Sequence, residues 1–177
     1  MTPDPTTRDE IIAALAFRRD QILTHLHAFD DDAFMVGTTA HWGPAQHTAH
    51  LTLGHRRVAK LLRAPKDLPT ATFAPRGYDT TRDAYLDKLA GTSPERLALN
   101  SKSGELTDGA TRLTLIEGYR KAVGALIDSV TGWDEGPLDT VGFPHPILGV
   151  LPVRDMLLFM LYHDLHHLNG MRGTLPR

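Results

Sequence analysis

The feature that most constrains the fold is the stretch 156–162 (MLLFMLY), in which every residue is apolar. It lies in a segment that we expect to be helical from about Pro152 to Gly170. A helix that is apolar on every side belongs in the interior of a protein, and this stretch is far shorter than the ~20 residues that cross a bilayer. The rest of the chain is therefore expected to surround a central helix.

Three further stretches carry apolar residues at helical spacing, and we expect helices over 7–29, 44–63 and 108–130. Their apolar positions are Ile11, Leu15, Ile22, Leu26 and Phe29 in the first, Leu51, Val58, Leu61 and Leu62 in the second, and Leu113, Ile116, Val123, Ile127 and Val130 in the third. No segment alternates with the period of two that a half-buried strand shows, so no strand is expected. The pattern predicts an all-α four-helix bundle in a single domain, 1–177.

The connection between the second and third helices, from 64 to about 106, is long for a bundle. Its first part contains three prolines, Pro65, Pro69 and Pro75. They exclude a continuous helix there, whereas 80–90 predicts a short extra helix closed by Gly91. Residues 100–104 are expected to form a polar loop.

Composition narrows the range of functions. The net charge of −2 provides no basic field for nucleic acid or an anionic membrane. The chain has no cysteine, so thiolate ligands, disulfides and a cysteine nucleophile are excluded. The first residues lack the basic start and apolar stretch of a signal peptide, so a cytoplasmic location is expected.

Histidine is unusually frequent, with ten residues. Most fall in three groups: His25 and His27; His41, His47, His50 and His55; and His163, His166 and His167. His163 and His167 are four residues apart, so both imidazoles face one side of the last helix and can share a metal ion. The third ligand must come from a facing helix, where His50 is the best candidate. The alternative is that the pair consists of hydrogen-bonded core residues.

The remaining histidines receive other interpretations. We interpret His25, His27 and His55 as solvated helix residues. His145, between two prolines, is interpreted as structural. His166 is either a core residue or a residue at the rim of the site.

Two segments carry a family resemblance. The segment 145–155 (HPILGVLPVRD), followed by 162–167 (YHDLHH), resembles the C-terminal signature of the DinB/YfiT-like superfamily, a His-Pro-x-x-Gly turn and a helix with His-x-x-x-His. The segment 42–51 (WGPAQHTAHL) resembles its second-helix motif. The resemblance implies that His50, His163 and His167 are metal ligands. Gly170 stands where many members carry glutamine.

The resemblance also implies a function. It suggests a divalent metal (Zn, Ni, Fe or Mn, all of which accept imidazole) and transfer of a low-molecular-weight thiol, bacillithiol, mycothiol or glutathione, to a small electrophile. Arg56, Arg57 and Arg154 are candidates for binding the thiol. The alternatives are a non-catalytic, stress-related metal-binding protein and a metal-dependent hydrolase. A homodimer is also expected. Metal affinity should fall as the pH drops through about 6.5, the range in which histidine titrates.

Overall fold

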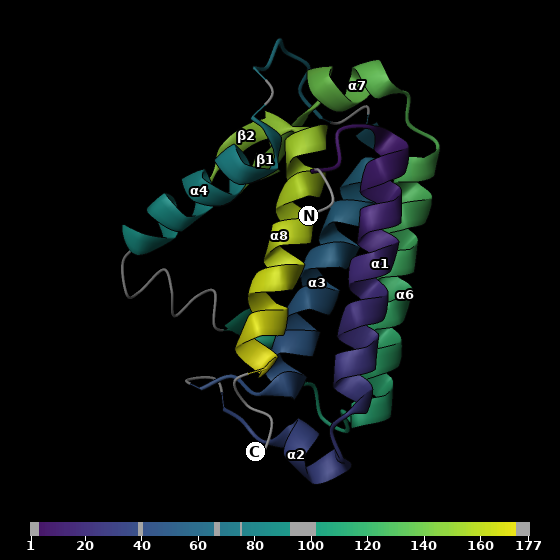
Figure 1. Cartoon of the computed structure of the whole chain (residues 1–177), viewed down its shortest axis with the longest axis vertical. Helices are drawn as coiled ribbons and strands as arrows, with labels where there is room; N and C mark the ends of the chain where they lie inside the picture. The colour runs from purple at the N-terminus through teal and green to yellow at the C-terminus, as the bar shows by residue number, and fades with distance from the viewer. Residues whose placement is uncertain (1–3, 39–40, 66–67, 75, 93–101, 173–177) are drawn as a thin grey trace.

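The computed structural model describes residues 4–38, 41–65, 68–74, 76–92 and 102–172. Pro75 and two residues of the expected polar loop, Asn100 and Ser101, lie outside these ranges. Four long helices form the predicted bundle (Figure 1). They are α1 (Arg8–His27), α3 (Pro44–Leu62), α6 (Arg112–Thr131) and α8 (Val153–Arg172).

The four helices run in two parallel pairs. Trp133, just after α6, donates a hydrogen bond from Nε1 to the carbonyl of Leu62 at the end of α3 (3.2 Å), so α3 and α6 end at the same end of the bundle. Arg8, which begins α1, donates to the carbonyl of Trp133 (2.8 Å). The α1 helix is therefore antiparallel to α6. Because α3 and α6 are parallel, the chain must return along the bundle between them, which explains the long connection.

That connection contains the predicted extra helix. Helix α4 (Gly77–Ala90) begins before the expected residue 80, ends at Gly91 as predicted, and packs against α8. The short 3-10 helix η2 (Lys102–Gly104) packs against α3, where a polar loop was expected.

Helix α8 is central, as its apolar stretch predicts. Every residue from 156 to 162 is at most 8% exposed. The helix packs against α1, α3 and α4. No helix in the described ranges is long and apolar enough to cross a membrane.

The start of α6 differs from the expectation. Gly109 has φ +75°, a left-handed conformation that interrupts a helix, and the Thr111 hydroxyl caps α6 by accepting the amide hydrogen of Thr114. Leu113 thus lies in the first turn and is 67% exposed, so its placement on the apolar face was wrong. The other four predicted positions, Ile116, Val123, Ile127 and Val130, pack in the core.

Besides η2, three small elements were not predicted. A two-stranded antiparallel hairpin, β1 (Gly142–His145) and β2 (Gly149–Pro152), precedes α8, so the expectation of no strand was wrong. Strands of four residues are too short to show a clear alternation. The short helices α2 (Asp31–Met35) and α7 (Glu135–Thr140) cover the two ends of the bundle (Figure 1).

Candidate metal centre

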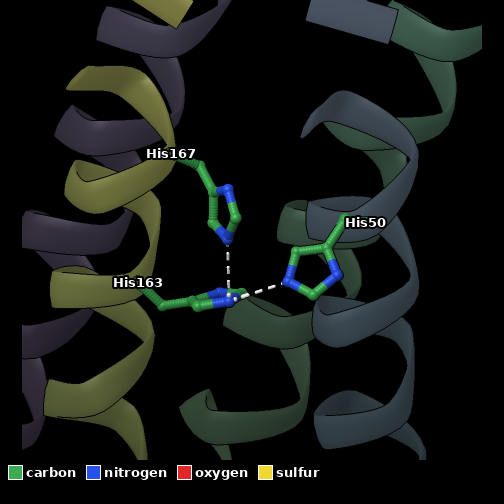
Figure 2. A group of neighbouring side chains, drawn as sticks. All are labelled: His50, His163 and His167. Carbon is green, nitrogen blue, oxygen red and sulfur yellow. Dashed lines mark hydrogen bonds between the residues drawn. The ribbon is translucent and has the colours of Figure 1, made fainter. Parts of the chain in front are cut away.

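The antiparallel crossing of α3 and α8 brings the predicted histidines together. His50 on α3 lies opposite His163 on α8, and His47, one turn earlier, lies opposite His167, one turn later. Figure 2 shows the rings of His50, His163 and His167 pointing toward one another from the two helices. The spacing of the histidines within each helix places two rings on one face. The register between the two helices then places each ring opposite one ring of the other helix.

The three rings approach one another through their Nε2 atoms. Nε2 of His163 lies 2.9 Å from Nε2 of His50 and 3.1 Å from Nε2 of His167. One nitrogen of each ring lies within 4.8 Å of the other two. Two nitrogens bound to one ion at about 2.0–2.1 Å are about 2.9 Å apart at a right angle and about 3.4 Å apart at the tetrahedral angle. The arrangement could therefore hold a single metal ion.

Burial keeps these rings unprotonated. His163 and His167 are only 6% and 7% exposed, and His50 is half-buried. Burial, reinforced by neighbouring histidines, lowers the pKa of His50 to about 4 and the pKa values of His163 and His167 well below their usual range. The lone pairs that a metal requires are thus available at neutral pH.

The outer nitrogens of the rings have different surroundings. Nδ1 of His167 lies 2.8 Å from Nδ1 of His47, and Nδ1 of His50 is hydrogen-bonded to the hydroxyl of Ser103. Nδ1 of His163 is buried without a hydrogen-bond partner among the described residues. The sequence analysis missed Ser103, because its place beside His50 depends on how the connection returns to α3.

Trp42 forms a wall of the site. Its ring centroid lies 5.0 Å from that of His50 and 5.9 Å from that of His167, to which it is nearly parallel. Gly104 of η2 packs closely on the indole, since a Cβ atom there would come within 2.8 Å of it. Phe159 stacks on the other side, against His163, at 5.3 Å. The site is therefore bordered by aromatic rings.

His55 corrects the sequence interpretation. It was expected to be solvated, but it is fully buried, with Nε2 3.3 Å from Oδ2 of Asp164. Tyr119 donates its hydroxyl to the same carboxylate oxygen at 3.4 Å. Asp164 lies on α8, so the pattern of residues along α3 could not reveal it as the partner of His55.

The other histidines are not directed toward the point where the three candidate ligands meet. His145 is structural, as interpreted, because its Nδ1 accepts the amide hydrogens of Ile147 and Leu148 in the hairpin turn. His27 is exposed and His25 is half-buried beside Phe29. His166 is exposed at the rim.

One of the arginines proposed for thiol binding is engaged elsewhere. Arg154, in the first turn of α8, forms ion pairs with Asp139 (2.6 Å) and Glu135 (2.8 Å) of α7. At 1.5 Å per residue, the backbone of Arg154 lies about 14 Å before that of His163 along α8. Arg57, in contrast, is exposed two turns after His50 on the same face of α3.

Comparison with known families agrees with this geometry. The sequence model of the DinB superfamily matches residues 36–171. The chain belongs to the DinB superfamily. The matched region includes Trp42 and all three convergent histidines of this DinB-superfamily protein. Neither a curated protein nor a solved structure gives a significant match.

Proposed function

We propose that this DinB-superfamily protein binds one divalent metal ion through His50, His163 and His167 and uses it to transfer a low-molecular-weight thiol to a small electrophile. The observation that carries the proposal is the convergence on one point of three neutral imidazoles, two of them buried and one half-buried. A donor set of three imidazole nitrogens suits zinc, nickel, iron or manganese. Calcium and magnesium prefer oxygen ligands.

Three protein ligands leave coordination positions open, and a metal ion there supplies Lewis acidity that favours the thiolate form of a bound thiol. The roles of the protein's own residues follow from their positions. The three histidines are neutral, so they leave the positive charge of the ion uncompensated. Trp42 and Phe159 limit the access of water to the rings. The chain has no cysteine, so the nucleophilic sulfur comes from bacillithiol, mycothiol or glutathione.

Two further features are candidates for binding the substrate: a hollow that shares Trp42 with the surroundings of the three histidines, and a nearby arginine. Trp42 also lines a hollow of about 490 Å³ with His41 and Val36, a volume suited to a small organic electrophile. Arg57 provides a positive charge near His50, where it can pair with a carboxylate of the thiol. Among the described residues, no carboxylate is hydrogen-bonded or ion-paired to the three histidines, so a hydrolase would lack a general base in contact with them.

The test combines metal analysis with thiol conjugation. Elemental analysis of the purified protein should give one equivalent of a transition metal, and His163→Ala should remove it. With each of the three thiols and 1-chloro-2,4-dinitrobenzene, the loaded protein should conjugate at least one thiol, and His163→Ala should fall to the uncatalysed rate. His27→Ala is the matched control, because His27 is exposed and lies on α1.

Each outcome has a distinct meaning. Metal binding without conjugation of any thiol would refute thiol transfer and favour a non-catalytic metal-binding protein. Metal content that is unchanged by His163→Ala would refute the site itself.

A further inference from the structure

We propose that His47 positions the ligand His167 by accepting a hydrogen bond from it, and that Gly170 provides the space for the His47 ring. The inference rests on the proposed metal site. It assigns a role to a histidine that is not itself a ligand and to the glycine that departs from the family pattern.

The first step concerns the proton on His167. Its Nε2 faces His163 at 3.1 Å and its Nδ1 faces His47 at 2.8 Å. A neutral imidazole that coordinates through Nε2 carries its proton on Nδ1. Nδ1 of His167 then donates to Nδ1 of His47, which must be the unprotonated nitrogen of that ring. Ligand histidines usually donate to a carboxylate, a carbonyl or water, and here a neutral ring accepts.

The second step concerns space. Gly170 follows His167 by about one turn on α8, so it lies on the same face. A Cβ atom at Gly170 would lie 3.0 Å from Cε1 and 3.1 Å from Nε2 of His47. A larger residue would therefore displace the ring that contacts His167. Trp42 packs edge-on against His47, with ring centroids 5.4 Å apart, and restrains it from another side.

The third step separates a hydrogen bond from simple ring packing. The centroid of the exposed His166 ring also lies 5.1 Å from that of His167, the same distance as for His47. Among the described contacts, only His47 is hydrogen-bonded to Nδ1 of His167. His166 is thus a matched control for an imidazole at equal distance.

The experiment measures the affinity for Zn²⁺ alone by competition with a chelator. His47→Ala should weaken zinc binding about 10- to 100-fold, the usual effect of losing such a partner. His47→Asn, whose amide oxygen can occupy the position of Nδ1, should recover most of that loss. Gly170→Ala alters no imidazole but should also weaken binding, whereas His166→Ala should leave it unchanged.

The possible results separate two failures. If the wild-type protein binds zinc no better than His163→Ala, the proposed site is wrong. If the wild type binds tightly, His163→Ala does not, and His47→Ala matches His166→Ala, only the role of His47 is overturned. If circular dichroism shows that His47→Ala does not fold, His47→Asn and Gly170→Ala decide the question. Full zinc affinity in Gly170→Ala together with lost affinity in His47→Asn would contradict the proposal.

A second readout does not depend on affinity. Nitrogen-15 spectra of the zinc-loaded protein should show Nδ1 of His167 protonated and Nδ1 of His47 unprotonated. A proton on Nδ1 of His47 would overturn the assignment of His47 as the acceptor.

Discussion

Burial of the three candidate ligands determines how the site responds to acid. A metal ion competes with protons for imidazole, and from the sequence alone this competition was expected near the usual histidine pKa. In the structure, burial lowers the pKa of His50 to about 4 and the pKa values of His163 and His167 well below 6.5. The rings of the folded protein are therefore unprotonated at mildly acidic pH.

We predict that the affinity of the folded protein for zinc is nearly constant from neutral pH to about 5.5 and falls as the pH approaches about 4. Competition with a chelator of known proton affinity, measured at each pH, tests this. A midpoint near 6.5 in protein that is still folded would show that the rings are solvated.

The same lowered pKa values affect the stability of the metal-free protein. Below about 6.5 the unfolded chain takes up protons on these histidines, whereas the folded chain does not. The free energy of unfolding is therefore expected to decrease as the pH falls from 6.5 toward 4. Circular dichroism at each pH defines the range in which the affinity measurement is valid.

At the scale of single residues, the sequence predicted part of the candidate metal site. The spacing of His163 and His167, together with the family motif around His50, identified the three rings that meet in the structure. It did not predict the hydrogen bond between His50 and Ser103 or the contact between His47 and His167. Both depend on the register of α3 against α8 and on the path of the connection, which no local pattern encodes.

At the scale of the secondary-structure elements, the buried carboxylate of Asp164 connects three helices. His55 on α3 and Tyr119 on α6 both contact Asp164 on α8, and all three side chains are fully buried. Burial, the largest single effect, would lower the pKa of His55, but the charge of Asp164 and the hydrogen bonds to Asp164 and to the carbonyl of Leu51 together raise it. The raised pKa favours the protonated ring beside the carboxylate of Asp164. The contribution of this pair to stability is complete below about 6.5 and is lost as the pH rises through the raised pKa.

We predict that His55→Leu lowers the free energy of unfolding by about 3–5 kcal/mol, because it leaves the charge of Asp164 buried and unpaired. The double variant His55→Leu/Asp164→Leu should recover most of this loss, since it removes the charge as well. Urea unfolding at pH 7 measures both. The exposed His27→Leu is the control, with an expected change within about 0.5 kcal/mol. A single variant as stable as the wild type would contradict an ionic pair.

The elements also show where periodicity fails as a predictor. The buried stripe of α1 follows its sequence pattern, with Ile11, Leu15, Ile22 and Leu26 in the core. Leu113 and the hairpin before α8 do not follow theirs. A residue in the first turn of a helix can face solvent whatever its hydropathy, and a hairpin of four-residue strands is held by its pairing and by His145 in its turn.

For the whole molecule, the apolar core accounts for the fold without any ion. Two clusters of buried apolar side chains run through the bundle, and the stretch 156–162 belongs to the larger one. The number of long helices in the bundle followed from the sequence. The parallel arrangement of α3 and α6 did not, because the long connection was compatible with several paths.

We predict that removing the metal with a chelator leaves the far-ultraviolet circular dichroism spectrum unchanged and lowers only the midpoint of thermal unfolding. Zinc at 100 times its dissociation constant should add about 2.7 kcal/mol of stability. His163→Ala should gain none of it. Loss of helical signal on chelation would show that the ion is needed to form the bundle.

The distance of 113 residues between His50 and His163 has a consequence for biosynthesis. At about 5–20 residues per second, a ribosome needs roughly 6–23 s to extend the chain from the first of these positions to the second. Until then the nascent chain carries only one of the three rings, and α1 and α3 lack the helix that packs against them. An ion bound at the proposed site could therefore be captured only after α8 has emerged, so a loaded centre would mark a chain whose synthesis has passed its last helix.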